Sequence, residues 1–161
     1  WHNLHGSGFA DRSLHGRVVE VAGHRIAGLG GTFEQRVWLP GSLDTGIQNY
    51  EDFLERLALR PQRADIVATK KQNALSAIFP DDYFSLAMER ADILVCHEAP
   101  SCHPHGYSEI DELAQAMGAQ MVVHGHHHDC LDYRSDWPKL GFEAHGVAFR
   151  SIMAIDGSVI S

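Results

Sequence analysis

The sequence predicts an α/β fold, in which short buried strands alternate with amphipathic helices. Two apolar runs, at residues 93–96 and 120–124, have the length of buried strands. Between them, residues 108–117 carry apolar side chains at the spacing of one helix face. A third observation is the alternating stretch 17–29, which predicts a β-hairpin. The apolar helix positions are Ile110, Leu113, Ala114 and Met117.

The first part of the chain predicts a loop followed by this hairpin. Residues 1–16 are rich in glycine, serine and histidine, which is typical of a loop. Arg17–Val21 alternates between apolar and polar side chains, and Ala22 and Gly23 supply a tight turn. His24–Leu29 then returns as the second strand. The glycine cluster at the end of this strand does not predict a dinucleotide loop, because no helical pattern follows it.

Two helices are predicted before the central strands. Apolar residues recur at helical spacing over 47–58, and Asp81 can cap a helix that runs to about Ala91. The stretch 32–47 is rich in loop-forming residues, and 65–69 is too short to classify. The expected buried face of the second helix consists of Tyr83, Phe84, Ala87 and Met88.

The stretch 93–124 predicts a β-α-β unit with parallel strands and a right-handed crossover. Residues 108–111 match a capping box at the helix start, and Gly118 matches a C-terminal stop. Parallel strands end at the same edge of a sheet, where α/β proteins place their sites. His97 and the histidines of 124–128 should therefore lie together at that edge.

The end of the chain, residues 142–160, predicts two further strands with Asp156 and Gly157 as a turn. The sequence contains no internal repeat, low-complexity segment or linker. Its 161 residues are enough for one hydrophobic core, so a single domain, 1–161, is expected.

Composition argues against several classes of protein. The net charge of −8 excludes a general nucleic-acid binder, which normally carries a basic face. The short basic pairs, Arg60 with Arg63 and Lys70 with Lys71, are expected to be solvated surface. No run of about 18 apolar residues is present, so neither a transmembrane helix nor a membrane partner is expected. No pattern indicates an oligomeric state.

The cysteines favour a reducing compartment, and we expect the protein to be cytoplasmic. Three cysteines, an odd number, do not predict a disulfide framework, and their spacing fits no zinc knuckle. Cys96 is expected to be a buried packing residue. The other two are Cys102 and Cys130.

Histidines at the two central strand ends predict a metal site. Imidazole is the commonest protein ligand for zinc, iron and manganese-type ions. His97 ends one strand, and His126 and His128 follow a glycine at the end of the other. In a strand-like segment, His124 would share their face and His127 would point away, as a supporting or surface residue. The remaining histidines considered are expected to be structural or surface residues: His2, His5, His15, His24 and His145.

Residues beside these histidines are candidates for supporting roles. His103 and His105 lie in the loop after the first central strand. These two, together with His124, either contact a substrate or are ordinary structural residues. Glu98 and Asp129 flank predicted ligands, and a carboxylate in that place can orient an imidazole.

One stretch of the chain resembles a known family. Gly125-His126-His127-His128 is similar to the closing Gly-His-x-His motif of the calcineurin-like metallophosphoesterases. Cys96-His97 stands where that family has its Gly-His motif, at a suitable distance upstream. The stretch from residue 17 to the end looks like the C-terminal half of such a domain. The resemblance implies a sandwich of two mixed β-sheets flanked by helices, of which this chain would contain the C-terminal part.

The resemblance also implies an activity. In that family a two-metal centre hydrolyses phosphomonoesters or phosphodiesters, because two cations clamp the phosphoryl oxygens and activate a water. By resemblance, His97 and His126 would bind one metal and His128 the other. The cofactors would be two divalent ions, manganese, iron or zinc. The partner would be a phosphorylated small molecule or another phosphoester substrate.

The chain also departs from the family pattern. Cys96 replaces a glycine, and the Asp-x-His, Gly-Asp and Gly-Asn-His motifs are missing. Those motifs supply the bridging aspartate, further ligands and the general acid, so no catalytic residue is identified. Because the chain starts at Trp1 without an initiator Met, we expect a fragment that lacks its N-terminal motifs.

Two other hypotheses remain open. The first is a non-catalytic metal-binding or interaction domain, which the missing carboxylate ligands favour. The second is a mononuclear zinc hydrolase, in which His97, His126 and His128 form a three-histidine site with an open position.

Overall fold

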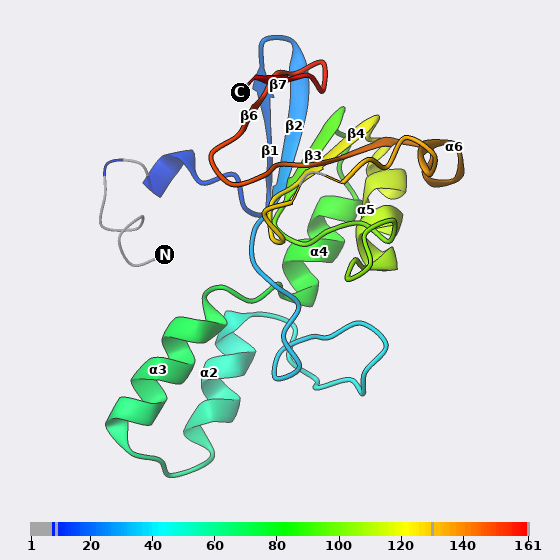
Figure 1. Cartoon of the computed structure of the whole chain (residues 1–161). Helices are drawn as coiled ribbons and strands as arrows, with labels where there is room; N and C mark the ends of the chain where they lie inside the picture. The colour runs from blue at the N-terminus through cyan, green and yellow to red at the C-terminus, as the bar shows by residue number, and fades with distance from the viewer. Residues whose placement is uncertain (1–7, 9, 130, 161) are drawn as a thin grey trace.

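The protein has an α/β fold, as predicted, and its main sheet is a mixed sheet of five strands (Figure 1). The computed structural model describes residues 8, 10–129 and 131–160. The predictions for His2, His5 and Cys130 therefore lie outside the described residues. The main sheet has the order β1 (Arg17–Val21), β2 (His24–Leu29), β3 (Ile93–Cys96), β4 (Met121–His124) and β5 (Glu143–Gly146).

Helices connect these strands, and a second, smaller sheet follows them. The described residues also form a two-stranded sheet of β6 (Ile152–Met153) and β7 (Val159–Ile160). The helices are η1 (Ala10–Arg12), α2 (Tyr50–Ala58), α3 (Ala64–Ala74), α4 (Pro80–Ala87), α5 (Ser108–Met117) and α6 (Trp137–Leu140). No helix among these residues is long and apolar enough to cross a membrane.

The predicted hairpin forms the first edge of the main sheet. β1 and β2 pair antiparallel, and the turn between them has Ala22 at φ 52° and Gly23 at φ 81°. Two successive positive φ angles match the twist of a two-residue hairpin, and glycine adopts one of them without steric cost. In Figure 1 this turn lies at the end of the sheet that is remote from α2 and α3.

The predicted β-α-β unit is confirmed. β3 and β4 are parallel and joined by α5, whose four predicted apolar positions are all buried. Gly118 ends α5 in the left-handed conformation, at φ 72°, as its position predicted. The capping box is wrong, because Tyr107 is the N-cap and makes no side-chain cap. Ser108 instead lies inside the helix, where its hydroxyl donates to the neighbouring carboxylate of Glu109.

Helix α4 is shorter than predicted and buries a different face. It begins at Pro80 and ends at Ala87. Leu86 is fully buried, whereas Phe84 and Met88 are 58% and 87% exposed, so that part of the predicted face is wrong. Its rotation is fixed by Tyr83, whose hydroxyl donates to the backbone carbonyl of Glu109 in α5 at 2.8 Å.

The main core fills the space between the sheet and helices α4 and α5. Leu29, Leu94 and Val122 contribute from three neighbouring strands, and Leu113 contributes from α5. All four side chains are completely shielded from solvent. Each buried side chain of this size stabilises the fold by roughly 1.5–3 kcal/mol, so this core holds the strand ends in place.

A helical hairpin of α2 and α3 projects from the rest of the molecule (Figure 1). The helix predicted over 47–58 is confirmed as α2, although it begins only after the N-cap Asn49. The unclassified stretch 65–69 lies inside α3, whose polar composition gave it little helical periodicity. A small second core stabilises the hairpin: Val37, Ile47, Phe53, Ala74, Ala77 and Phe79.

The C-terminal region contains three short strands where two were predicted. β5 joins the main sheet parallel to β4, and β6 and β7 form a separate antiparallel pair. The turn between the last two contains Asp156 and Gly157, as predicted, and Gly157 has φ 81°.

Candidate histidine site at the sheet edge

Parallel pairing of β3 with β4 brings two of the three predicted metal ligands, His97 and His126, into contact. Cys96 of β3 is in register with His124 of β4, so the residues that follow both strands leave the sheet at the same edge. The His126 amide donates to the His97 carbonyl at 3.0 Å. The two imidazole rings lie 4.5 Å apart, centroid to centroid. The prediction that these histidines share one edge is confirmed.

The segment after β4 is a turn and not a continued strand. β4 ends at His124, and His128 has a positive φ of 55°. The alternation that placed His124, His126 and His128 on one face therefore does not apply. His126 contacts His97, whereas the ring of His128 lies 5.8 Å from that of Phe149.

The three predicted ligands still affect one another electrostatically. The pKa of His97 is lowered by burial and by the neighbouring imidazoles of His126 and His128. A lowered pKa keeps the ring neutral near pH 7. Neutral imidazole is the form that binds a metal ion.

Glu98 is a buried carboxylate that lies next to His126. Its side chain is only 4% exposed, and one carboxylate oxygen accepts from the backbone amide of Phe33 at 3.0 Å. The other oxygen lies 3.6 Å from Nδ1 of His126. Burial raises the pKa of Glu98. The predicted role for this carboxylate, beside an imidazole, agrees with its position.

A second group of histidines lies next to the first. Nε2 of His103 lies 3.2 Å from a carboxylate oxygen of Asp129, and its Nδ1 accepts from the backbone amide of His105. The ring of His127 stacks on that of His103, with centroids 3.8 Å apart. His127 therefore turns away from His97 and packs against the 98–107 loop, which makes it a supporting residue.

His124 is the most deeply buried imidazole among the described residues. It is 2% exposed, and neither ring nitrogen has a hydrogen-bond partner among the residues that the structure describes. Burial is the main cause that lowers its pKa to about 4, and His103 adds to the effect. An unpaired buried polar group destabilises a fold by roughly 1–3 kcal/mol.

The three candidate substrate contacts differ in their exposure to solvent. His103 and His124 are buried, so a ligand could reach either ring only after a rearrangement of the surrounding loops. His105 is exposed. Of the three, His105 alone is positioned to contact a ligand from solvent.

Cys96 behaves as the predicted packing residue. It is buried, and its Sγ donates to the backbone carbonyl of Glu98 at 3.1 Å. Burial raises the pKa of the thiol well above its usual value, which disfavours the reactive thiolate. The thiol therefore stabilises the strand end and is not placed as a ligand.

The described side chains do not by themselves form a complete metal site. Within residues 8, 10–129 and 131–160, no group of three histidine, cysteine or carboxylate side chains is arranged to hold an ion. The contact between His97 and His126 supplies two candidate ligands. His15 and His145, predicted to be structural, each contact a carboxylate, on Asp82 and Glu143 respectively.

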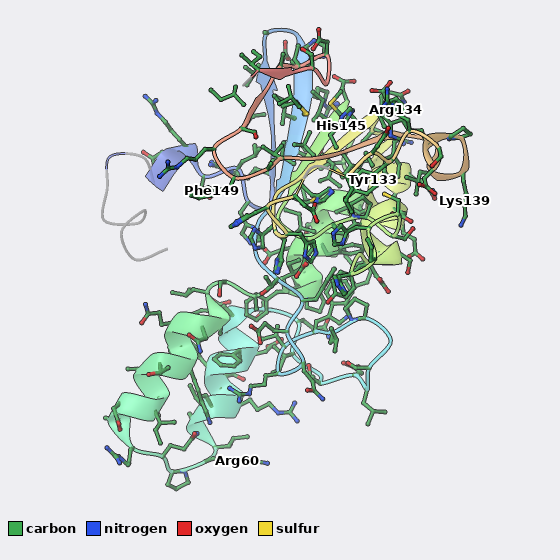
Figure 2. All side chains as sticks on the ribbon, viewed as in Figure 1. Arg60, Tyr133, Arg134, Lys139, His145 and Phe149 are labelled. Atoms are coloured by element: carbon green, nitrogen blue, oxygen red, sulfur yellow. The ribbon has the colours of Figure 1, made fainter. Side chains whose placement is uncertain are left out.

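A second cluster of charged side chains, far apart in the sequence, lies outside the histidine site. Arg60 and Lys70, predicted to be solvated surface, line a pocket of the helical hairpin together with Arg36 and Arg56. Figure 2 shows Arg60 on that hairpin, far from Tyr133 and His145, which lie beside the sheet. These cations are spread over 35 residues of sequence, so no local pattern could group them.

Comparison with known proteins identifies a relative. No family model and no solved structure matches the chain. The chain is 36% identical over 158 residues to an uncharacterized protein of Haemophilus influenzae. The match covers 98% of this chain and 67% of that protein. The chain therefore belongs to the same family as this Haemophilus influenzae protein.

Proposed function

We propose that the protein is a metal-dependent phosphoric ester hydrolase, of the calcineurin-like type that its histidine motif resembles. The observation that carries the proposal is the meeting of His97 and His126 at one sheet edge, with ring centroids 4.5 Å apart. The third predicted ligand, His128, is near enough to contribute to the lowered pKa of His97. A nearby set of neutral imidazoles is suited to hold a divalent cation.

The side chains present fit part of such a centre. Nδ1 of His126 is buried and faces a carboxylate oxygen of Glu98 at 3.6 Å, so Nε2 is the ring nitrogen that would carry a lone pair for a metal ion. His97 offers a second neutral imidazole. Among the residues that the structure describes, no third ligand lies at the same point.

The residues around the pair have separate tasks in the proposed reaction. Divalent cations, when bound, would stabilise the phosphoryl charge and activate a water. Imidazole ligands carry no negative charge, so His97 and His126 would leave the positive charge of those cations available to an anionic ester. Glu98, anchored by the Phe33 amide, would fix the orientation of His126. His105 is exposed at the same edge and could contact the bound ester.

The proposal takes the remaining ligands and the general acid from other parts of the whole protein. The matched relative is longer than the aligned stretch, which covers 67% of it. Under the proposal, the five-stranded sheet is one layer of a two-sheet sandwich, the protein is a single cytoplasmic domain, and its substrate is a phosphomonoester or phosphodiester. The cations would be two ions of manganese, iron or zinc.

A second candidate function is a non-catalytic metal-binding or interaction domain. The observation that favours it is the absence of a three-ligand group among the residues described. A mononuclear zinc hydrolase that uses His97, His126 and His128 is a third candidate. Metal count and turnover distinguish these three functions.

The test uses the full-length protein. We expect purified protein to hydrolyse 4-nitrophenyl phosphate or bis(4-nitrophenyl) phosphate in added manganese, and to lose that activity after chelation. Elemental analysis should find two divalent ions per chain. One ion with turnover would favour the mononuclear zinc hydrolase. Bound metal without turnover of either ester would favour the non-catalytic domain and contradict the proposal.

A further inference from the structure

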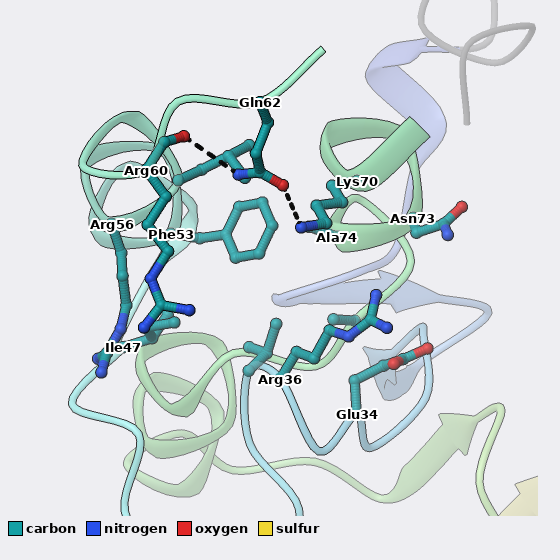
Figure 3. A pocket seen from close by; sticks show the side chains of 13 residues that line it. Glu34, Arg36, Ile47, Phe53, Arg56, Arg60, Gln62, Lys70, Asn73 and Ala74 are labelled. Atoms are coloured by element: carbon teal, nitrogen blue, oxygen red, sulfur yellow. Dashed lines mark hydrogen bonds between the residues drawn. The ribbon is translucent and has the colours of Figure 1, made fainter. Parts of the chain in front are cut away.

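A pocket in the helical hairpin combines an apolar floor with a positively charged rim (Figure 3). It lies between α2, α3 and the segment 34–37, and its volume is about 220 Å³. Phe53 and Ile47 form part of the floor, and Figure 3 shows the Phe53 ring facing the cavity. The cationic side chains that line the pocket are Arg36, Arg56, Arg60 and Lys70.

The charge of this pocket is opposite to that of the chain as a whole. The protein has a net charge of −8, whereas four cations and one carboxylate, on Glu34, line the pocket. An excess of positive charge around a partly enclosed cavity attracts anions, because the low-dielectric walls focus the field. The positive charge around the pocket is therefore a local feature and does not follow from the net negative charge of the chain.

The cations of the pocket are not neutralised by carboxylates. Lys70 donates to the side-chain carbonyl of Gln62, and Arg56 donates to the backbone carbonyl of Thr45. Both acceptors are uncharged. Arg36 and Arg60 form no ion pair with any carboxylate in the described part of the chain.

Three arginines outside the pocket, Arg25, Arg63 and Arg134, are paired with carboxylates. Arg63 lies 3.0 Å from a carboxylate oxygen of Asp65, and Arg134 pairs with Asp132. Lone arginines on a surface are common, but two of them beside a lined cavity leave their donor forks free for a ligand. The contrast between Arg60 and Arg63, three positions apart, gives a matched pair for an experiment.

We propose that this pocket binds a small organic anion that has an apolar body. A guanidinium fork binds carboxylate, phosphate or sulfonate oxygens in pairs, which places the charged group of the ligand at the rim. The apolar body then covers the floor around Phe53 and Ile47. Mostly apolar pockets with a few placed polar groups are typical small-molecule sites. The proposal does not depend on the metal chemistry of the histidine site.

The probe is naphthalene-2-sulfonate, which carries both features and resists phosphoesterase action. Binding to the full-length protein is measured by isothermal titration calorimetry in the presence of a chelator, so bound metal plays no part. Inorganic sulfate and naphthalene-2-sulfonamide are the comparison probes. We expect each to bind at least about tenfold more weakly, because each lacks either the apolar body or the charge.

Two variants assign the binding to this pocket. Arg60→Glu should weaken the naphthalene sulfonate at least about tenfold, whereas Arg63→Glu, outside the pocket, should leave its affinity unchanged. Arg36→Glu should repeat the Arg60 result. Circular dichroism checks that each variant is folded. His126→Ala should retain the binding, which separates this proposal from the proposed hydrolase.

Three results would overturn the proposal. The first is no detectable binding of the sulfonate at millimolar concentration. The second is equal affinity for the sulfonate and the neutral sulfonamide, which would leave the cations without a role. The third is an equal loss of affinity in Arg60→Glu and Arg63→Glu, which would indicate a diffuse charge effect.

Discussion

The histidine site and the basic pocket belong to two differently built parts of the molecule. His97 and His126 follow parallel strands whose main core includes the fully buried Leu94 and Val122. The pocket lies in a two-helix hairpin stabilised by a small core around Phe53. The strand ends place the imidazoles of His97 and His126 by backbone geometry. The hairpin displays exposed cations on long, flexible side chains. Rigidly held side chains suit a reacting centre, and flexible side chains suit the recognition of a ligand.

The segment 33–37 is one of two that join the two parts, the other being 75–79 between α3 and α4. The amide of Phe33 donates to Glu98, beside His97, while Val37 belongs to the small core of the hairpin. Arg36 is three residues from Phe33, and three extended residues span at most about 11 Å. Arg36, at the pocket rim, is therefore close along the chain to Phe33, which contacts the carboxylate beside His126.

The largest expected effect is on hydrolysis. His126→Ala in the full-length protein should lower phosphoesterase activity at least about 100-fold, because even residues that only orient metal ligands are worth 10–100-fold. His24→Ala is the control, since His24 is an exposed residue at the other end of the parallel strands. Initial rates with an aryl phosphate in manganese measure the effect. Equal rates in the two variants would remove His126 from the site.

The next effect separates the stabilities of the two parts. Leu113→Ala, in the main core, and Phe53→Ala, in the hairpin core, should each lower stability by about 3 kcal/mol. Amide hydrogen exchange should then differ between the variants. Leu113→Ala should accelerate exchange throughout the molecule, whereas Phe53→Ala should accelerate it in α2 and α3 alone. Global acceleration in both variants would mean that the hairpin and the sheet unfold as one unit.

A third effect is the pH dependence of stability that arises from His124. The pKa of His124 is about 4 in the folded protein and about 6.5 in an unfolded chain. Between these values the unfolded state binds a proton that the folded state does not. The free energy of unfolding should therefore fall as pH decreases from 6.5 to 4, by about 3 kcal/mol at most.

Replacement of this histidine isolates its contribution. His124→Leu should make the decrease in stability shallower over that range, while His24→Leu, at an exposed position, should not. Urea unfolding at several pH values, in a chelator, measures both. The titratable groups that face His124 stay in place in both variants: His103, Asp129, His127 and His145. An unchanged slope in His124→Leu would contradict the buried, uncharged state of this ring.

The smallest effect concerns the start of the hairpin. The side-chain oxygen of Asn49 accepts from the backbone amide of Asp52 at 3.0 Å, and its Nδ2 donates to Asp81 at 2.8 Å. Asn49→Ala should lower stability by about 1 kcal/mol, the usual value of an N-cap. The change should appear as faster hydrogen exchange at the first turn of α2. Unchanged exchange there would show that the cap does not limit opening of the hairpin.

The sheet and its edge were predictable because their signals are local or topological. The apolar runs 93–96 and 120–124 gave the strands, and the intervening helix required them to be parallel. Because parallel strands end at the same edge of a sheet, His97 could be placed near His126 without any knowledge of side-chain contacts. The fold class and the shared edge follow from periodicity and chain connectivity alone.

Other features depend on tertiary contacts that periodicity does not encode. The alternation rule failed after His124, because the chain turns there and His127 stacks on His103. The face of α4 is set by the hydrogen bond from Tyr83 to the start of α5. Helix α3 is mostly polar, so its small apolar face gave no clear pattern. The basic pocket required three separate segments to fold together before its cations could meet.

The most direct test of the account is the metal content of the full-length protein, wild type against the double variant His97→Ala/His126→Ala. Elemental analysis after purification without chelator should find two divalent ions per wild-type chain and at most one in the double variant. Circular dichroism confirms that both proteins are folded. Equal metal content in the two, or no metal in the wild type, would contradict the proposal that the shared strand edge is a metal-binding site.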